Sequence, residues 1–356
     1  MTMITRDIAM SSTQEKKTMT IYDIAKEAGV SASTVSRVLT NSANVRKEKR
    51  EKIQALIDKY NFKPNALAKS LSDTRSNLIG IISADVRNPF YSAVYIACEN
   101  AARERGYRVF LCNSLGQKDR EIEQLHMLMQ QRVDAIIQIG GRVDDLVTDE
   151  EYANEARTVA EKVPLVTSGK VDNVISYSVR IDAMEASTLL TEHLIQLGHK
   201  KIALIGGRMD VLSTYEKYQT YRNILEKNDI EFCEDYIFSG GYDQETGYAG
   251  IKKMLGLKEL PTAVIAINDS AAAGIVRGLT EMGLSIPGDM SIVSYDNTFI
   301  ANLVMPRLTS IDYDYNTLGE RLISTAIDVM NGDNCPYYQP IQPNIVVRES
   351  SGKPKN

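Results

Sequence analysis

The sequence predicts an α/β protein in two parts, a small basic helical module followed by a much larger module of alternating strands and helices. The first observation is charge: residues 16–75 carry 13 Lys or Arg against 6 Asp or Glu, a net charge of +7, whereas the chain after residue 75 carries a net −11. The second is pattern, because short apolar runs alternate with amphipathic stretches after residue 77, which is typical of parallel β-α-β packing.

Length and composition exclude several classes of protein. The chain has 356 residues, 43% of them hydrophobic and 24% charged, which is too long for one typical domain and too mixed for a disordered or fibrous protein. Neither a membrane-spanning apolar run nor a secretory signal is recognisable, so we expect a cytoplasmic protein without a membrane partner. Residues 1–17 lack periodicity and resemble a leader derived from an expression vector.

The basic module begins with signals for two short helices. Thr20 can cap a first helix, with Asp23 completing a capping box, and Gly29 ends that helix. Ser31 can then cap a second helix over 32–39. Two short helices joined by a glycine turn predict a helix-turn-helix.

The second helix carries an outward face suited to DNA. Small polar residues and the forked donor Arg37 share this face and could lie close to base edges in a major groove. A third helix is predicted over 47–60, with an apolar stripe inside and several lysines outside. Those lysines could hold phosphates or simply face solvent, and a solvated basic face remains the alternative for the whole module.

Several segments together identify a family resemblance. They are Thr20-Ile-Tyr-Asp-Ile-Ala-Lys-Glu-Ala-Gly-Val-Ser31, Ala32-Ser-Thr-Val-Ser-Arg-Val-Leu39, Lys63-Pro-Asn-Ala-Leu-Ala-Lys-Ser-Leu71, Asn88-Pro-Phe-Tyr91, Leu197-Gly-His-Lys-Lys-Ile-Ala203, Ile286-Pro-Gly-Asp289 and Val347-Arg-Glu-Ser350. The sequence resembles the LacI (lactose repressor) family of bacterial transcriptional regulators over about residues 18–351. The resemblance implies a helix-turn-helix headpiece joined to two doubly wound α/β subdomains of periplasmic-binding-protein type.

The resemblance also assigns roles in DNA binding. It makes Ala32, Ser33 and Arg37 base contacts, Tyr22, Ser31, Thr34 and Ser36 phosphate contacts, Asn65 and Ala68 part of a hinge helix, and Leu71 a minor-groove wedge. Phosphate contacts set the register of the protein on DNA, and an apolar wedge bends it. Two residues depart from the family pattern: Arg46 stands where a capping Ser is common, and Thr40 where an Asn often follows the recognition helix.

The large module reads as two sets of strands. Apolar runs at 78–82, 109–112 and 135–139 predict one sheet, and runs at 179–181, 202–205, 263–267 and 291–294 predict a second. Ligands bind outside the carboxyl ends of such strands, which selects the loops after Ile82, Ile205, Ile267 and Ser294.

These loops carry the chemistry that a hydroxylated effector needs. The residues that match effector positions of the family are Asn88, Phe90, Tyr91, Lys217, Tyr242, Asn268, Asp269 and Asp296. Aromatic rings can stack on a sugar, and the polar side chains offer directional hydrogen bonds. Asp269 could instead cap the following helix, and Asn88-Pro89 could simply shape a turn.

Lys217 departs from the family in a way that bears on the effector. Sugar-responsive members generally have an Arg there, and Lys cannot reproduce the bidentate hydrogen bonds that the planar guanidinium donates to two hydroxyls. Either the ligand presents one charged or polar atom, or Arg222 or Arg208 takes over. Lys170 likewise replaces a common arginine. The hypothesis from these changes is an acidic effector, so a sugar, a sugar acid and a sugar phosphate all stay open.

We therefore predict a homodimeric repressor that binds a near-palindromic operator under effector control. A phosphocarrier corepressor is possible within the family, and no heptad tail of the tetrameric members is seen. The resemblance implies that the chain crosses between the lobes more than once, and with it the expected divisions are a leader at 1–17, a headpiece at 18–63, a hinge and linker at 64–76, a first lobe at 77–176 with 308–332, a second lobe at 177–307 with 333–350, and a tail at 351–356.

Two other classes are weighed against this prediction. A solute-binding protein of a transporter would share the two-lobed fold but would have no use for the basic module. An enzyme would need a catalytic constellation, and the sequence has no GxSxG, HExxH, GxxxxGK[ST] or GxGxxG motif. We therefore expect no cofactor. The four cysteines lie far apart with no CxxC, so a zinc site or a disulfide framework is not predicted either.

Overall fold

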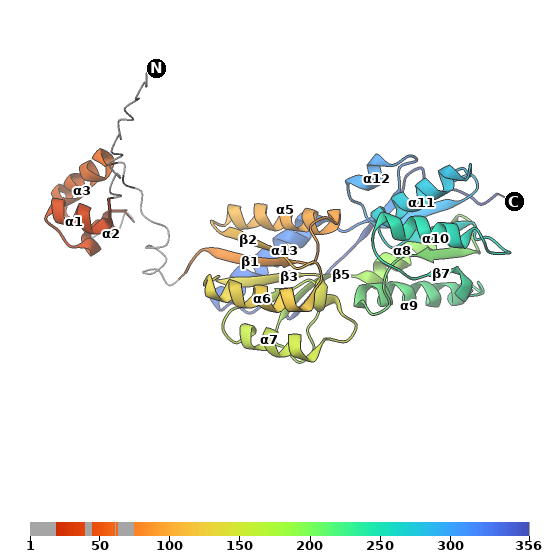
Figure 1. Ribbon diagram of the computed structural model, residues 1–356, viewed down its shortest axis with the longest axis horizontal. Helices are drawn as coiled ribbons and strands as arrows, with labels where there is room; N and C mark the ends of the chain where they lie inside the picture. Colours follow the sequence, from red (N-terminus) through yellow and green to blue (C-terminus); the bar gives the residue numbers. More distant parts are fainter. Residues whose placement is uncertain (1–18, 40–44, 61, 63–74, 356) are drawn as a thin grey trace, which may run out of the picture. The chain divides into compact units, whose positions relative to one another are not determined.

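The computed structural model describes residues 19–39, 45–60, 62 and 75–355. The predictions for the leader, Thr40, Asn65, Ala68 and Leu71 lie outside this range. The chain divides into two compact units, Met1–Arg75 and Ser76–Asn356, and each is described by itself (Figure 1).

The first unit contains three helices, α1 (Ile21–Ala28), α2 (Ala32–Leu39) and α3 (Lys47–Lys59). The predicted capping box at the start of α1 is present, since the Thr20 side chain accepts from the Asp23 backbone N–H and the Asp23 carboxylate accepts from the Thr20 N–H. Gly29 ends α1 in the left-handed conformation, with φ +70°. One fully buried residue from each helix forms the centre of the core: Ile24, Val35 and Ile53.

The second unit is built on two six-stranded sheets. The first has the order β11 (Tyr338–Ile341), β5 (Tyr177–Ile181), β4 (Leu165–Thr167), β3 (Ala135–Ile139), β1 (Leu78–Ser83) and β2 (Arg108–Asn113). The second has the order β12 (Asn344–Val346), β10 (Thr309–Asp312), β9 (Ser291–Asp296), β8 (Ala263–Ala266), β6 (Ile202–Ile205) and β7 (Ile237–Phe238). Neighbouring strands run parallel except for the antiparallel pair of β10 and β12.

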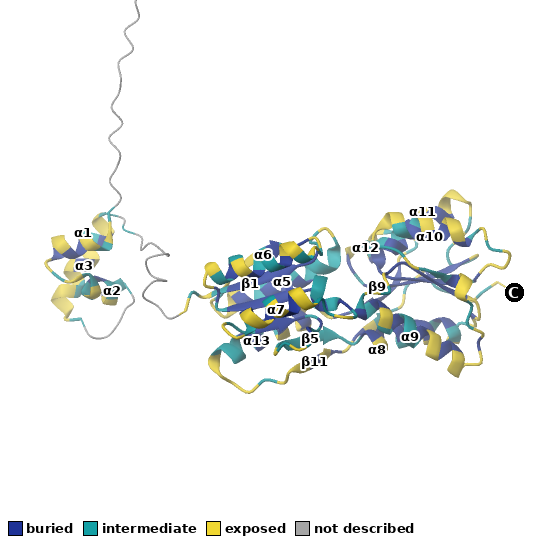
Figure 2. Ribbon diagram, turned by 60° about the horizontal axis from the view of Figure 1, so that its bottom comes forward, coloured by how far each residue is buried: buried dark blue, intermediate teal, exposed yellow. Residues whose placement is uncertain are grey.

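Helices cover both faces of each sheet, as the apolar strands require. On the first sheet, α5 (Pro89–Glu104) and α13 (Tyr315–Asn331) share one core, and α6 (Lys118–Gln130) and α7 (Glu150–Ala160) share the other. On the second, α8 (Ala183–Gln196) and α9 (Leu212–Lys227) cover one face, and α10 (Gln244–Met254) and α11 (Asp269–Glu281) cover the other. Figure 2 shows the buried strands between these layers.

Three short elements complete the second unit. They are the 3-10 helices η1 (Gly141–Asp144) and η2 (Glu234–Tyr236) and the short helix α12 (Phe299–Leu303). No helix in the described ranges is long and apolar enough to cross a membrane.

The predicted boundaries between the lobes are wrong at three points. The sequence assigns 177–181 to the second lobe, but β5 pairs with β4 and β11 in the first sheet. It assigns 308–312 to the first lobe with α13, but β10 pairs with β9 in the second sheet. It assigns the whole of 333–350 to the second lobe, but of the two strands in this segment β11 pairs with β5 in the first sheet and β12 joins the second. The apolar run at 179–181 identifies a strand but not its pairing partner, whereas the bounds 308–332 and 333–350 follow from the family resemblance.

Candidate functional site

Helix α2 presents the polar face that the sequence predicts for DNA. Ser33 and Arg37 are exposed, and Ala32, Thr34 and Ser36 are partly so. The Ser31 Oγ lies 2.8 Å from the Ser33 Oγ and accepts from the Thr34 backbone N–H at 3.3 Å, so Ser31 also caps the helix.

Side chains beside α2 extend this exposed surface. Tyr22, at the start of α1, has 74% of its surface exposed. On α3 the predicted inner residues Ile53 and Ile57 are buried, whereas Lys47 and Lys49 face solvent. Arg46 occupies the cap position of α3 without a side-chain cap bond, as the departure from the family pattern suggests. The headpiece therefore offers hydroxyls and positive charges to a polyanion.

The second unit holds a cavity of about 740 Å³ between its two sheets. Seven of the eight predicted effector residues line it: Asn88, Phe90, Tyr91, Lys217, Tyr242, Asn268 and Asp296. This volume is in the range of small-molecule sites. Most of the lining residues follow the carboxyl ends of strands, as the rule for parallel sheets predicts.

Asp269 does not line the cavity, which corrects the prediction that it contacts the effector. Its side chain is 1% exposed and accepts four hydrogen bonds inside the second lobe. The hydroxyls of Ser294 and Ser310 donate to Oδ1 at 2.6 and 2.8 Å, and the backbone N–H and hydroxyl of Thr298 donate to Oδ2 at 2.6 and 2.9 Å. A carboxylate with all its acceptor positions occupied is a structural hub.

The two predicted asparagines cap helices as well as lining the cavity. The Asn88 Oδ1 accepts from the Phe90 N–H at 3.1 Å at the start of α5. The Asn268 Oδ1 accepts from the Ala271 N–H at 2.8 Å at the start of α11, and its amide donates to the Tyr242 carbonyl at 2.9 Å. Asn268, not Asp269, is therefore the cap of α11.

Aromatic rings form part of the cavity wall from both lobes. Phe90 packs edge-on against Tyr91, Tyr313 and Tyr315, with ring centroids 5.1 to 6.0 Å apart. The Tyr242 hydroxyl lies 2.9 Å from the Thr214 hydroxyl. These contacts hold the rings in place, so a flat apolar ligand face meets a preformed surface.

Lys217 and Asp296 form the charged centre of the cavity. Both are buried, at 8% and 7% exposure, and the Lys217 ammonium lies 4.0 Å from the centroid of the Tyr295 ring. Burial lowers the pKa of Lys217, while the carboxylates of Asp296 and Asp144 oppose that shift. Burial raises the pKa of Asp296 to about 7, against the attraction of Lys217. The two side chains attract each other electrostatically.

The turn that carries Asp296 is conformationally strained. Asp296 and Asn297 both have positive φ, +97° and +46°, which costs a residue with a Cβ of order 1 kcal/mol or more. The Tyr315 hydroxyl donates to the Asp296 carbonyl at 2.6 Å, and the Arg348 guanidinium donates to the Asn297 side chain at 2.7 Å. Contacts from distant parts of the chain thus hold Asp296 toward the cavity.

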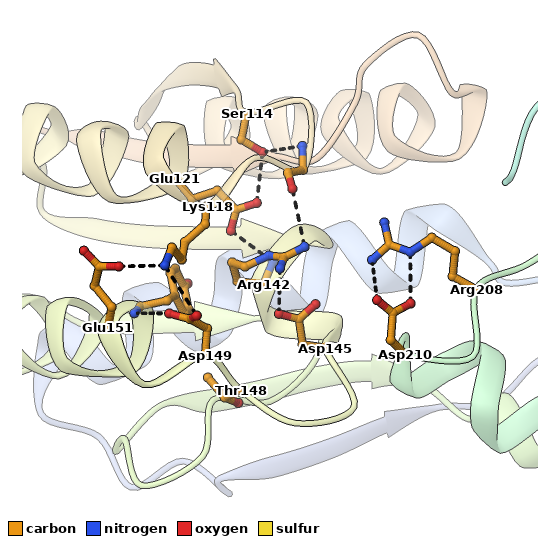
Figure 3. Close-up of polar contacts among 12 residues, drawn as sticks. Ser114, Lys118, Glu121, Arg142, Asp145, Thr148, Asp149, Glu151, Arg208 and Asp210 are labelled. Atoms are coloured by element: carbon orange, nitrogen blue, oxygen red, sulfur yellow. Dashed lines mark hydrogen bonds and ion pairs between the residues drawn. The ribbon is translucent and has the colours of Figure 1, made fainter.

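Each arginine that lines the cavity has an acidic partner. The pairs are Arg87 with Asp85, Arg142 with Asp145, Arg180 with Glu216, and Arg208 with Asp210; Figure 3 shows the second and fourth of them. Of the two arginines that could take over from the arginine missing at position 217, one lines the cavity and the other does not. Arg208 lines the cavity, whereas Arg222 lies over the Phe232 ring outside it. Lys170 is also outside the lining and pairs with Asp172 at 2.7 Å.

A seam of polar contacts joins the two lobes beside the cavity. The Asp144 carboxylate accepts from the Ser213 hydroxyl at 2.6 Å and from its backbone N–H at 3.2 Å. The Leu146 N–H donates to the Asp210 carbonyl at 2.8 Å. The cap residue of α9, Val211, makes no side-chain cap bond, so an aspartate of the first lobe caps a helix of the second.

The contacts of this seam were not predicted from the sequence. The loops predicted to bind a ligand follow four strands and do not include the loop after β3, which begins with Gly140 and Gly141. The same strand-end rule would have included this loop and so Arg142 and Asp144. No local signal pairs Asp144 with Ser213, because 69 residues separate them.

Comparison with known families supports both halves of this description. Residues 20–65 match the family described as bacterial regulatory proteins, lacI family, and residues 191–351 match the periplasmic binding protein-like domain. Catabolite control protein A of Priestia megaterium is 33% identical over 310 residues, which cover 86% of this chain and 92% of the relative. The HTH-type transcriptional repressor PurR of Actinobacillus pleuropneumoniae is 31% identical over 341 residues, covering 93% and 98%.

Solved structures give the same result. The lac repressor dimer bound to operator and the anti-inducer ONPF superposes with a TM-score of 0.85 at 28% identity, covering 94% of this chain and all of that one. A complex of the transcriptional regulator CelR with cellobiose superposes with a TM-score of 0.70 at 25% identity and the same coverage.

Proposed function

Since the chain belongs to the LacI family and is a DNA-binding transcriptional repressor with an effector-binding domain, we propose which of its residues bind the operator and which bind the effector. The basic headpiece binds a near-palindromic operator as a homodimer, and a metabolite in the cavity between the lobes controls that binding. The reading as a transporter's solute-binding protein is not favoured, since that class has no use for a headpiece. Because a repressor acts on the chromosome, we place it in the cytoplasm and assign it no catalytic step.

The exposed polar face of α2 is the observation that supports operator reading. Ser33 and Arg37 are exposed there, on a module whose net charge is positive. A small residue permits close approach to base edges, and a guanidinium can bond a guanine through two hydrogen bonds. Selection of bound duplexes from a random library tests this proposal. We expect inverted repeats to be enriched, and enrichment of no sequence over the starting library would contradict it.

The cavity favours a neutral, polyhydroxylated effector over the acidic one that Lys217 suggested from sequence. Each lining arginine already has a carboxylate partner, and Asp296 and Asp144 stand close enough to Lys217 to affect its pKa. An added anion would meet those carboxylates. A hydroxyl, by contrast, can accept from the Lys217 ammonium and donate to the Asp296 carboxylate at once. The cellobiose bound to the structural relative CelR is of this class.

A thermal-shift screen tests the effector class. Neutral sugars, sugar acids and sugar phosphates are compared at equal concentration, since a ligand that binds only the folded protein raises its Tm. We expect a neutral sugar to raise the Tm of the natural chain and Lys217→Met to abolish the shift. Stabilisation by acidic sugars alone would contradict the proposed class.

Exposed apolar residues on α5 and α12 offer a surface for the homodimer. Ile96 is 56% exposed, Phe299 67% and Leu303 73%. In Figure 1, α5 and α12 lie along the upper side of the effector domain, one on each lobe. Large exposed apolar side chains mark interaction surfaces when they gather. Sedimentation tests this surface: we expect Leu303→Glu to shift the dimer toward monomer, and an unchanged sedimentation coefficient would rule the surface out.

Effector control requires the ligand to favour one arrangement of the lobes. The Asp144–Ser213 contact joins the lobes next to the ligand cavity, so any ligand that prefers closed lobes also favours this seam. The direction of the effect on DNA is measured by titrating the effector into the selected operator complex. The phosphocarrier corepressor considered from sequence stays a prediction, which the same assay tests with and without such a carrier.

A further inference from the structure

Glu121 is a fully buried carboxyl group outside the cavity lining. It lies on α6 with 0% of its surface exposed. Three donors from other segments converge on it: the Ser114 hydroxyl at 3.1 Å, the Gln138 amide at 2.6 Å and the Arg142 backbone N–H at 3.0 Å. Figure 3 shows Glu121 between Ser114 and Arg142. An acid is rarely buried in this way unless its partners compensate the loss of water.

The turn at Gly140 and Gly141, next to Glu121, has little conformational freedom. Gly140 and Gly141 both have φ +70°, where a side chain would be strained. A Cβ on Gly141 would lie 2.0 Å from Glu121 Oε1, and one on Gly140 would lie 2.5 Å from the Tyr91 hydroxyl. Glycine is therefore required at both positions, because Glu121 and Tyr91 press directly against the backbone.

The same turn leads straight into the seam between the lobes. Arg142, whose N–H is bonded to Glu121, lies in η1, which ends at Asp144. Asp144 then bonds Ser213 of the other lobe, and Leu146 bonds Asp210. We propose that Glu121 is a positioning residue: its carboxylate sets the place of the Gly140–Asp144 turn and thereby the strength of the seam through which the effector acts. This inference rests on the proposed function for its consequence, but not for its geometry.

The charge of Glu121 can be varied experimentally by changing the pH. The titratable groups that face it are Arg142 of η1, Tyr152 of α7 and Tyr91 of α5. Tyr152 donates to the Gln138 side-chain oxygen at 2.5 Å, which turns the Gln138 amide toward Glu121. Burial raises the pKa of Glu121 to about 7, against the Arg142 and Ser114 contacts that favour its charged form. The carboxylate therefore loses its charge in an accessible pH range.

Hydrogen exchange in the full-length protein, without effector or DNA, tests the proposal. A hydrogen bond to a carboxylate is about twice as strong as one to a neutral acceptor. We therefore expect the Arg142 amide, followed in a peptide over 139–147, to be about fivefold better protected at pH 8 than at pH 6 after correction for intrinsic exchange, provided that it exchanges by a local opening that breaks its bond to Glu121 and leaves the carboxylate buried. This local effect is opposite in sign to the effect of pH on global unfolding, because only global unfolding returns the carboxylate to water. Glu121→Gln keeps the shape without the charge and should stay at the pH 6 level throughout.

A fluorescent reporter extends the test to the seam. The chain has no Trp, so Val147→Trp, at a site 78% exposed next to Leu146, gives a single signal. The tryptophan emission should change with a midpoint near pH 7 when Glu121 is present, and it should not change in Glu121→Gln. Ser114→Ala removes one bond to the charged form and should raise that midpoint, which keeps the proposal testable if Glu121→Gln fails to fold.

Either of two results would overturn the proposal. One is a pH profile that changes with the same midpoint in the natural background and in Glu121→Gln; the other is a flat profile in both, with no shift in Ser114→Ala. Because neither experiment contains a ligand or an operator, these outcomes are independent of the DNA selection and of the effector screen. A second reporter, Met282→Trp, at a site 51% exposed just after α11, serves as the control for general pH effects.

Discussion

The recognition face of the headpiece and the wall of the effector cavity use their residues in opposite ways. On α2, Ser33 and Arg37 are exposed, while a separate set, Val35 and Val38, forms the core. In the cavity, Asn88 and Asn268 both face the ligand space and cap the helices that carry them. On α2 the proposed base contacts are separate from the apolar core, although Ser31 combines a predicted phosphate contact with a cap; in the cavity, binding and helix capping are combined in the same asparagines.

This difference predicts how each region responds to substitution. A change at an exposed position of the α2 face should alter DNA binding more than it alters the stability of the fold. A change in or directly behind the cavity wall should alter both, because a side chain lost there also removes a cap or a buried hydrogen bond. The following experiments test the contrast, beginning with the largest expected effect.

Asp269→Ala should produce the largest loss of stability. Four hydrogen bonds end on this buried carboxylate, and its removal leaves the Thr298 N–H and the serine hydroxyls without their acceptor. We expect the free energy of unfolding to fall by about 3 to 4 kcal/mol, measured by urea unfolding. Asp243→Ala, at the exposed cap of α10 in the same lobe, is the control and should cost about 1 kcal/mol. Equal losses would show that the hub is unimportant.

The stability of the effector domain should depend on pH through Glu121. Its pKa is raised in the folded state to about 7, from an ordinary value of 4.5, so the contribution is complete below pH 4.5 and is lost as pH rises through 7. The loss is at most about 3 kcal/mol. Urea unfolding between pH 5 and pH 8 measures it. Glu121→Gln should remove this share of the slope, and a slope identical to that of the natural chain would contradict the buried-charge explanation.

Arg37→Ala should separate binding from folding in the headpiece. We expect a loss of about 1 to 3 kcal/mol in discrimination at one base pair of each half-site, and a smaller loss in the free energy of unfolding than in Asp269→Ala, because Arg37 is exposed. Competition between the selected operator and single-base variants measures the discrimination. Lys52→Ala, which removes one exposed positive charge from α3, should weaken specific and random DNA alike. The same uniform loss in Arg37→Ala would mean that Arg37 contacts only the DNA backbone.

Thr20→Ala should give the smallest effect. The hydroxyl caps α1 from an exposed position, and caps of this kind contribute about 1 kcal/mol. Hydrogen exchange over 20–28 in the full chain reports the local stability of this helix. Lys26→Ala, on the exposed side of α1, is expected to change that exchange by less than about twofold. A cap variant with unchanged exchange would show that packing alone stabilises α1.

Local signals in the sequence predicted the headpiece closely. Thr20 with Asp23 and the left-handed Gly29 set the bounds of α1, and the predicted range of the second helix agrees with α2. These features act within one helical turn, so neighbouring residues suffice to read them. Most strands of the large module were also predicted, because short apolar runs mark them in the sequence.

In the effector domain, several contacts could not be predicted from neighbouring residues in the sequence. Asp269 matched a cavity position of the family, yet its neighbours in space turn it inward, and Asn268 takes the cap instead. Strand β5 was recognised as a strand but placed in the wrong sheet. The seam between Asp144 and Ser213, and the three donors on Glu121, come from segments that the sequence gives no reason to bring together.

Residue order alone therefore determined the elements, the charged division of the chain and the chemistry available at each strand end. Those properties depend on helix caps, turn residues and side-chain periods that operate over a few residues. The tertiary structure decided which acid faces the cavity, which arginines are already neutralised and which carboxylate supports the seam. Each of these depends on burial and on partners far away in the chain, because the cost of placing a charge out of water is set by whatever surrounds it in the folded protein.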